Sequence, residues 1–476
     1  MSAGSLANIL NKGSESLENS RAAIDVSGHN ISNAHTPGYS RQIVNLETKD
    51  PIQYGLHIFG QGARIQSIAR VHDSFLESQI QREVQVQNKT DTLSKGLQKL
   101  EGLFNPDLTS TIRDRLVSFS NAVRELSNSP EEPAVRINVI ENGKALSQAF
   151  NASYAGVLQI QVDSDESIHQ NITSLNEKLV EIAQLNAQVR EMSAGEKSGV
   201  NDLEDKQDKL VKEVGELIDI NVYKDNNNQI TVRGPNESLL VEGRLNSRLS
   251  MENNFSVQNR SRILVSEFDK PVFTDVTEKL HKGKIGALVE LRDVHAQRLR
   301  ESINTLAKGF GEQFNSIHEA GYGIDDLANK KGRPFFAGLN GPGEAGQNIA
   351  VDMTIVANPS AVSAAMSPET FGDNVVANKL VKLFYDPCLV DKSTTLTGFY
   401  DKMISQLGHD TAHAKEEATA SLIVYDKLKA QRESHSGVSL DEEAANLLKY
   451  QHLFNASSKI ITTANEMFQT VLDLKR

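Results

Sequence analysis

The two ends of this 476-residue chain both carry heptad-patterned segments, and this feature constrains the fold more than any other. In residues 1–32, side chains of the pattern recur at alternating spacings of four and three, which predicts a helix with a narrow apolar stripe. The large side chains that we expect to pack this stripe are Leu6, Leu10, Leu17, Ile24 and Ile31. Small residues, namely Gly13, Ser20 and Ser27, lie between them. A stripe this narrow leaves the helix marginally stable on its own.

The last helix is predicted over residues 439–475, where Ser439 and Glu442 form a capping box. Its stripe consists of Leu440, Ala444, Leu447, Gln451, Phe454, Ser458, Ile461, Asn465, Phe468 and Leu472. A neighbouring row widens the apolar face and consists of Ile460, Ala464, Met467, Val471 and Leu474. The simplest partner for either terminal stripe is the other one, which predicts an antiparallel or crossed pair of helices. The apolar surface left on this pair favours a homopolymer or ring over a monomer.

The first helix is expected to stop within residues 30–38, where the sequence TPG at 36–38 signals a turn. The residues that we predict to shape this turn are Asn30, Asn33, Gly38, Tyr39 and Gln42. Short alternating runs separated by glycine then predict a small β-region over residues 39–70.

Between the two ends, most of the chain shows helical periodicity. Helices are expected over residues 73–101, 107–129, 133–192, 202–218, 285–320, 374–385 and 397–434. Alternating β-formers and Asn-rich turns predict a β-rich insertion over residues 221–277, and residues 321–360 form an extended segment punctuated by Gly and Pro.

These elements predict a mainly α fold with a β insertion. We expect an elongated, multidomain chain with terminal coiled-coil-like helices, a long helical-bundle domain and a small antiparallel β-domain. The N-terminal part of the terminal helical domain, with its short β-region, is expected over residues 1–70, and the C-terminal helix that pairs with the N-terminal one over residues 437–476. The helical domain is expected in two parts, 71–220 and 281–436, with the inserted β-domain between them at 221–280. The absence of Trp and an aromatic content of 5% argue against one large aromatic-rich core.

Composition also excludes several classes of partner. A formal net charge of −12, with no cluster of Lys or Arg, argues against nucleic-acid binding. Cys388 is the only cysteine, so an internal disulfide is excluded and a buried or half-buried small side chain is expected. No apolar run approaches the roughly 18–20 residues that span a bilayer, so no membrane partner is expected. Residues 1–20 show no cleavable signal peptide, which leaves secretion by other machines open.

Two motifs resemble chemical sites, and both are weak. His409 and His413 have the i,i+4 spacing of zinc-binding helices, but Asp410 stands where such helices carry Glu, so a solvated helix face is favoured. The glycines of GPGEAG at residues 341–346 lack the strand and helix of a dinucleotide-binding unit, so a loop is favoured. We therefore predict no enzyme, and no catalytic, metal-binding or cofactor-binding residues. An exported zinc hydrolase that uses the two histidines is the alternative from another class.

Two terminal stretches carry a family resemblance. The sequence GHNISNAHTPGYSRQ occupies residues 28–42, and GVSLDEEAANL at 437–447 leads to QHLF at 451–454. At these residues the chain resembles the bacterial flagellar axial proteins, which are the rod, hook and hook-associated proteins, and QHLF is similar to the hook-associated members at the hook–filament junction. Interior stretches that strengthen the resemblance lie at residues 203–211, 283–288 and 310–322.

The resemblance implies a structural protein of the bacterial flagellum that connects hook to filament. The terminal residues named above then form the assembly interface, with the terminal helices lining an inner tube and the β insertion facing outward. It implies unfolded export through the flagellar type III apparatus, and a cytosolic chaperone on the C-terminal helix before export. The implied partners are further copies of the chain in a ring or helical array, the hook protein and a second hook-associated junction protein. A sibling axial protein, such as a hook or distal rod protein or the second junction protein, is the alternative within this family.

The segment after Phe336 is short. Longer members of the family carry a further β-domain at this point, so the resemblance implies that this outer domain is absent. Residues 338–346 are then expected to form the loop that remains.

Overall fold

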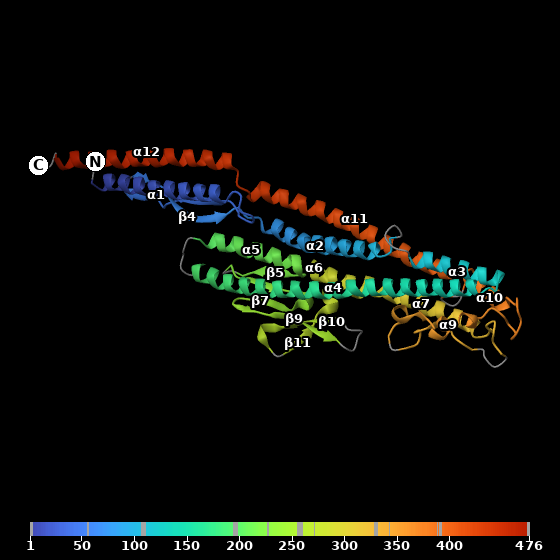
Figure 1. Cartoon of the computed structure of the whole chain (residues 1–476). Helices are drawn as coiled ribbons and strands as arrows, with labels where there is room; N and C mark the ends of the chain where they lie inside the picture. Colours follow the sequence, from blue (N-terminus) through green and yellow to red (C-terminus); the bar gives the residue numbers. More distant parts are fainter. Residues whose placement is uncertain are drawn as a thin grey trace.

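The computed structural model of the chain is an elongated, mostly helical molecule with small antiparallel sheets (Figure 1). The predicted fold class is therefore confirmed. The structure describes residues 3–54, 57–105, 111–193, 199–225, 228–254, 260–270, 272–327, 332–341, 343–387, 389 and 393–473. Cys388 lies outside these described residues, so its burial stays a prediction.

The α-helices account for most of the described residues. They are α1 (Ala3–Asn33), α2 (Ser74–Gly102), α3 (Ile112–Asn128), α4 (Pro133–Ser193), α5 (Val200–Leu217), α6 (Gly283–Glu290), α7 (Gln297–His318), α8 (Ala345–Asn348), α9 (Met353–Ala357), α10 (Val375–Leu383), α11 (Leu396–Ser436) and α12 (Leu440–Asp473).

The strands form antiparallel ladders of two to four members. They are β1 (Gln42–Thr48), β2 (Ile52–Tyr54), β3 (His57–Phe59), β4 (Ala63–Arg70), β5 (Asn221–Lys224), β6 (Ile230–Arg233), β7 (Leu239–Glu242), β8 (Leu245–Asn246), β9 (Arg248–Asn254), β10 (Arg260–Ser266), β11 (Phe273–Asp275), β12 (Phe336–Ala337) and β13 (Ala350–Val351). In the insertion, the ladders have the orders β5-β6-β7-β8 and β11-β10-β9.

Two predicted helices differ from the observed ones at their ends or middle. Helix α3 begins at Ile112 because Thr111 and Asp114 form a capping box there, whereas the pattern predicted a start at residue 107. The predicted helix over 285–320 begins at Gly283 and contains a π-helical turn over Leu291–Ala296 between α6 and α7.

The 61-residue helix α4 is the spine of the molecule and serves two separate cores. Its first part packs with α3 and α7, and its second part packs with α5, α6 and the β insertion (Figure 1). Between the cores lies a polar layer in which Gln161 donates to the carbonyl oxygen of Arg292 at 2.8 Å and accepts from Arg300 at 2.8 Å. The guanidinium of Arg292 is 2% exposed and pairs with Asp165 and Asp293. The π-helical turn carries Arg292 at this layer.

One core is rich in phenylalanine, and the prediction that no large aromatic core would form is wrong. Seven of the 17 phenylalanines pack together, with most ring centroids 4.8–6.4 Å apart. They are Phe119, Phe150, Phe310, Phe314, Phe335, Phe336 and Phe384. A low overall aromatic content does not limit how closely the few aromatic residues gather, and here they gather in one place.

Helix α4 holds the β insertion through amide side chains, of which Asn186 makes the most contacts and Asn176 bonds the backbone of Leu249. Asn186 is fully buried, and its Oδ1 accepts the backbone N–H of Ile230 at 2.9 Å. Its Nδ2 donates to the carbonyl oxygens of Ile230 at 2.8 Å and Gly243 at 3.0 Å. The side chain therefore satisfies backbone groups of two segments of the insertion.

The GPGEAG segment follows the two-residue strand β12 and leads into the four-residue helix α8. Elements this short do not build a dinucleotide-binding unit. Its glycines therefore belong to a connecting loop, within which Pro342 lies outside the described residues.

The two ends of the chain meet at one end of the molecule. Helix α11 packs along α2 and continues after a short connection into α12, which packs along α1 (Figure 1). Strands β1 and β4 pair with each other and lie against α1. We call α1, α12, β1 and β4 the terminal module, and the rest of the helical body the rod.

Candidate assembly site at the terminal helices

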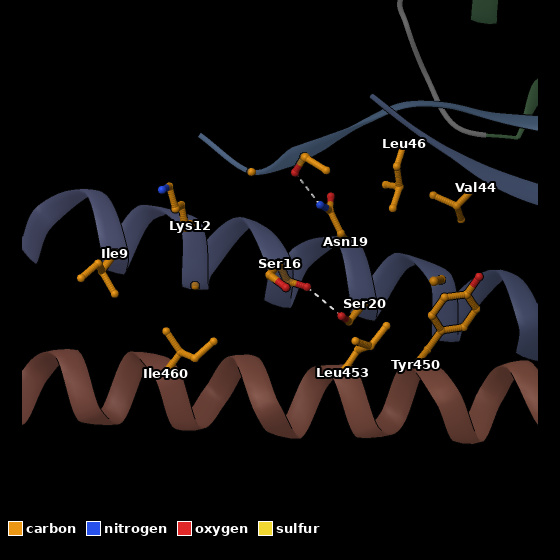
Figure 2. A pocket seen from close by; sticks show the side chains of 14 residues that line it. Ile9, Lys12, Ser16, Asn19, Ser20, Val44, Leu46, Tyr450, Leu453 and Ile460 are labelled. Carbon is orange, nitrogen blue, oxygen red and sulfur yellow. Dashed lines mark hydrogen bonds between the residues drawn. The ribbon is translucent and has the colours of Figure 1, made fainter. Parts of the chain in front are cut away.

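Helices α1 and α12 pack as an antiparallel pair through small side chains (Figure 2). The hydroxyl groups of Ser16 and Ser457 lie 2.7 Å apart across the seam. A Cβ atom added at Gly13 would lie 2.7 Å from Cγ1 of Ile461. Small residues therefore set how closely the two backbones approach.

On α1, the structure places the predicted stripe close to the seam but changes the roles of its members. Leu6 is buried, whereas the other large members, Leu10, Leu17, Ile24 and Ile31, are half-buried. The buried positions of the stripe are mostly the small ones, such as Gly13, Ser20 and Ser27.

On α12, the predicted stripe is rotated relative to the observed seam. The buried residues are Glu443, Ser457 and Ala464. Among the predicted positions, Leu447, Phe454 and Ile461 are half-buried, and those that remain exposed are Leu440, Gln451, Asn465, Phe468 and Leu472. The sequence prediction placed the large apolar residues in the seam. The two helices approach so closely that small residues occupy the seam instead, so the predicted register was wrong.

The predicted turn residues come together in one network after α1. The side chain of Asn30 donates to the carbonyl oxygen of Gln42 and accepts its backbone N–H, both at 2.9 Å. The hydroxyl of Tyr39 donates to Oδ1 of Asn30 at 2.7 Å. Asn33 caps the turn, since its carbonyl oxygen accepts the N–H of Thr36 at 2.9 Å. Asn30 thus fixes the register at which the chain reverses into β1.

Gly38 stands where the backbone requires a left-handed conformation, with φ of +88°. Its carbonyl oxygen accepts from the guanidinium of Arg432 on α11 at 3.2 Å. Residue 38 therefore connects the turn to the rod.

The next residues connect the turn to further elements. The N–H of Ser40 donates to Asp205 on α5 at 3.0 Å, and the amide of Gln42 donates to Asp202 at 2.8 Å. Arg41 pairs with Glu443 on α12 at 2.8 Å, and Glu443 is 2% exposed. We call residues 38–42 with these partners the joint, because they join the terminal module to the rod.

The strongest electrostatic feature of the joint is a buried arginine. Arg70, at the end of β4, is 5% exposed and contacts Glu204 at 2.6 Å, Asp205 at 2.7 Å and Asp208 at 2.8 Å on α5. Burial alone would lower the pKa of Arg70, but these carboxylates outweigh burial and raise it. Burial raises the pKa of Asp205 above its ordinary value, although Arg70 and the N–H of Ser40 oppose that shift.

Nearby charges also shift the pKa values of two other groups in this region. Burial raises the pKa of the Tyr39 hydroxyl, and the carboxylates of Asp202 and Asp205 raise it further. Nearby, Glu77 on α2 contacts Lys212 at 3.3 Å and also pairs with Arg432. These cations outweigh burial and lower the pKa of Glu77.

Arg70 and its carboxylate partners were not predictable as a site from the sequence. The available signal is the i,i+4 spacing of Glu204 and Asp208, which places both on one helix face. Their cation comes from a strand 135 residues away from Asp205. Nothing in the local pattern identifies that pairing.

The two histidines of the weak zinc motif lie on the surface of α11. Their side chains are 76% exposed at His409 and 62% exposed at His413. Within the described ranges, no group of three or more His, Cys, Asp or Glu residues is placed to hold a metal ion. In the same ranges, none of the helices combines the length and apolarity needed to cross a bilayer.

Known proteins match the chain along most of its length. A family model described as "Flagellar hook-associated protein FlgK helical domain" matches residues 97–336, and one described as "Flagellar basal body rod FlgEFG protein C-terminal" matches residues 430–474. Flagellar hook-associated protein 1 of Bacillus subtilis (strain 168) is 24% identical over 96% of each chain. The protein of that name from Salmonella typhimurium is 22% identical over 99% of this chain and 100% of its own length.

The fold is also similar to a solved structure. The flagellar hook junction protein FlgK from Burkholderia pseudomallei superposes with a TM-score of 0.67 at 14% identity. The match covers 76% of this chain and all of that one. The alternatives from the sequence, a sibling axial protein and an exported zinc hydrolase, gain no support from these matches.

Proposed function

The chain belongs to the FlgK family of flagellar hook-associated proteins and is a structural component of the hook–filament junction, and from this premise we propose that its terminal module is the part through which subunits assemble. The family predicted from the terminal sequence stretches is thereby confirmed. The observation that carries the proposal is the unfilled apolar surface of α12, described next.

Helix α12 exposes a row of large apolar side chains even after it has packed on α1. Each is 40–58% exposed, and they are Leu440, Leu448, Leu453, Ile460, Met467, Phe468, Val471 and Leu472. An exposed apolar row of this length is typical of a protein–protein interface. Neighbouring subunits would bury it, which contributes roughly 25 cal/mol per Å² of apolar surface removed from water.

The predicted interface residues divide between two roles in this proposal. Those that face the α1·α12 seam hold the pair together, and those exposed on α12 contact neighbouring subunits. The joint then sets the direction in which the terminal module leaves the rod. This division gives the proposed assembly a structural role and requires no catalytic group.

The route to the assembled state follows the family. The chain would leave the cytoplasm unfolded through the flagellar type III apparatus, and a cytosolic chaperone would cover the apolar row of α12 until export. At the hook tip, subunits would form a ring or helical array through head-to-tail contacts, which extend rather than close on themselves. The hook protein would lie on one side of this array and a second hook-associated protein on the other, with the terminal helices inward and the β insertion outward.

The proposed function is tested by deleting the gene in its source organism. Cells without the protein are expected to build hooks that lack filaments and to shed filament protein, and the wild-type gene is expected to restore filaments. Electron microscopy of the cell surface measures both outcomes. Cells that lack even hooks would indicate a rod or hook protein, and cells with normal filaments would contradict a junction role.

Replacing Gly13 with valine is expected to weaken the α1·α12 pair by about 1–3 kcal/mol, as overpacking does in tight seams. The reason is the 2.7 Å separation between the added Cβ atom and Ile461. The matched control is Gly28→Val on the same helix, because a Cβ atom there meets nothing within 4 Å. Filament counts in the deletion strain measure the result, and equal loss from both variants would contradict the seam.

Limited proteolysis of the monomer is expected to remove roughly the first 60 and last 40 residues before it cuts the rod. Helix α12 leaves large apolar side chains exposed in the monomer, so part of the packing that would oppose its local unfolding forms only in the proposed assembly. Mass spectrometry of a digestion time course locates the cuts, and assembled subunits serve as the protected control. Termini that outlast the rod in a proven monomer would contradict assembly-coupled ordering.

A further inference from the structure

One side of the terminal module carries an apolar groove between α1, α12 and the β1–β4 ladder (Figure 2). Its volume is about 430 Å³, and a second hollow of about 510 Å³ continues it along α12 through Ile9 and Ile460. We call both together the terminal groove. Its wall residues Leu46, Leu453 and Ile460 are 46–53% exposed, so the single chain leaves the groove unfilled.

The terminal groove is positively charged. Among the described residues that line it, Lys12 and Lys459 are the charged ones, and none is a carboxylate. Glu15, on the same helix as Lys12, pairs with Lys49. An occupant that fits this groove therefore combines apolar side chains with a negative charge.

The chain itself presents a segment of that chemistry at the far end of the β1–β4 ladder. Strands β2 and β3 form an antiparallel hairpin in which Ile52 lies opposite Phe59. The exposed fractions are 38% for Ile52, 46% for Phe59 and 71% for Ile58. Residues 50–59 contain Asp50 and neither Lys nor Arg.

We propose that the terminal groove of one subunit receives the β2–β3 hairpin of a second copy. The apolar side chains of the hairpin would fill the space beside Leu453 and Ile460, and Asp50 would approach Lys12. Within one chain, Ile58 stays 71% exposed, so the subunit's own groove does not hold it. A knob and a groove at different places on one chain make a heterologous contact, which extends from copy to copy. The inference rests on the proposed function and identifies the contact by which that assembly propagates.

The test uses photo-cross-linking in the deletion strain. Phe59 is replaced by benzoylphenylalanine, which keeps an aromatic ring at that position, and shed flagella are irradiated. The expected product has twice the subunit mass, and mass spectrometry is expected to place the link within residues 450–467 of the second copy. The matched control replaces Phe75, which is 68% exposed on α2, and is expected to give no such product. Adding Ile58→Ser to the Phe59 probe is expected to lower the yield about tenfold or more, as loss of one buried aliphatic side chain predicts.

A link that maps within one chain, to another protein or to another surface of the second copy overturns the proposal. Whether the cells build filaments distinguishes failure of this contact from failure of the proposed function. If the probe variant restores filaments and no groove link forms, the hairpin contact alone is wrong. If the wild-type chain restores no filaments, the proposed function is wrong.

Charge reversal supplies a second test that does not depend on the probe's size. Asp50→Lys and Lys12→Glu are each expected to lower the yield of the link about 1.4- to fivefold, which corresponds to the roughly 0.2–1 kcal/mol typical of exposed ion pairs. Co-expression of the two single variants is expected to raise it again, because a hairpin of one variant meets an oppositely charged groove wherever it contacts a copy of the other variant. No recovery on co-expression overturns the pairing of Asp50 with Lys12 between copies.

Discussion

Replacing Arg70 with methionine is expected to lower the free energy of unfolding by about 3–5 kcal/mol at pH 7, because removal of one partner leaves buried charges unpaired. The substitution leaves Asp205 and Asp208 without their cation, whereas Glu204 keeps Lys224 at 3.3 Å. The side chain of Asp205 is 9% exposed. Methionine keeps much of the volume of the side chain, so the loss reports charge more than packing. Urea denaturation followed by circular dichroism measures the effect.

The cost of this substitution is expected to shrink as the pH falls. In the variant, Asp205 loses the arginine that favours its ionised form, so burial raises its pKa further and it takes up a proton more readily. Protonation removes the unpaired charge, so variant and wild type should converge between pH 7 and pH 4.5. A difference that is independent of pH would contradict this electrostatic origin.

A matched control lies on the same strand. Arg64 on β4 is 61% exposed and pairs with Glu47. Arg64→Met is expected to change the free energy of unfolding by less than about 0.5 kcal/mol, as surface substitutions usually do. If both arginine variants lose the same stability, the burial of Arg70 is not the cause.

Acidification from pH 7 to pH 4 is expected to remove about 3 kcal/mol of stability through His318 alone. Burial lowers the pKa of His318 to about 4, and the cation of Arg333 adds to that shift. The ring accepts the N–H of Ser363 at Nε2, at 2.9 Å, and its Nδ1 lies 2.9 Å from the carbonyl oxygen of Arg333. A proton on Nε2 would face the N–H of Ser363, so the folded protein favours the neutral ring.

Acid destabilises the fold through His318 because this base has a lower pKa in the folded chain than in the unfolded one. Well above pH 6.5 the ring is neutral in both the folded and unfolded chains, and its contribution to stability is fully present. Below that pH the unfolded chain binds the proton first, so the contribution falls until the folded ring also titrates near pH 4. Stability of the phenylalanine core therefore decreases with acid over this window.

The comparison that isolates His318 uses two variants. His318→Gln is expected to be less stable at pH 7 and to lose the part of the pH dependence that belongs to this ring. His409→Gln, at a histidine whose side chain is 76% exposed, is expected to keep the wild-type dependence. Thermal unfolding at pH 7, 5.5 and 4 measures the three proteins. An unchanged slope in His318→Gln would show that other groups carry the acid sensitivity.

Sequence periodicity predicted most of the long helices because it depends on local spacing. The spine helix α4 was predicted over 133–192 and runs from Pro133 to Ser193. The phenylalanine core was not predictable from composition, because Phe119 meets Phe310 and Phe384 only after the chain has folded. The percentage of aromatic residues does not show which of them come into contact in the folded chain.

At the candidate site, the sequence located the turn but not what holds it. Asn30, Tyr39 and Gln42 are close in sequence and form one network, as a local pattern allows. The partner of Ser40 lies 165 residues away on α5, and that of Arg41 lies 402 residues away on α12. These partners follow from tertiary packing, which periodicity and turn signals do not encode.

The chain passes between the terminal module and the rod twice, through residues 71–73 and through residues 437–439. Arg41 ties the two passages together, since its N–H donates to the carbonyl oxygen of Ser436 at 3.0 Å and its own carbonyl oxygen accepts the N–H of Val71 at 2.8 Å. A module attached by a single linker can rotate about the single bonds of that linker. When two linkers are hydrogen-bonded to the same residue, rotation of the module strains both of them. The two connections therefore resist rotation of the terminal module relative to the rod.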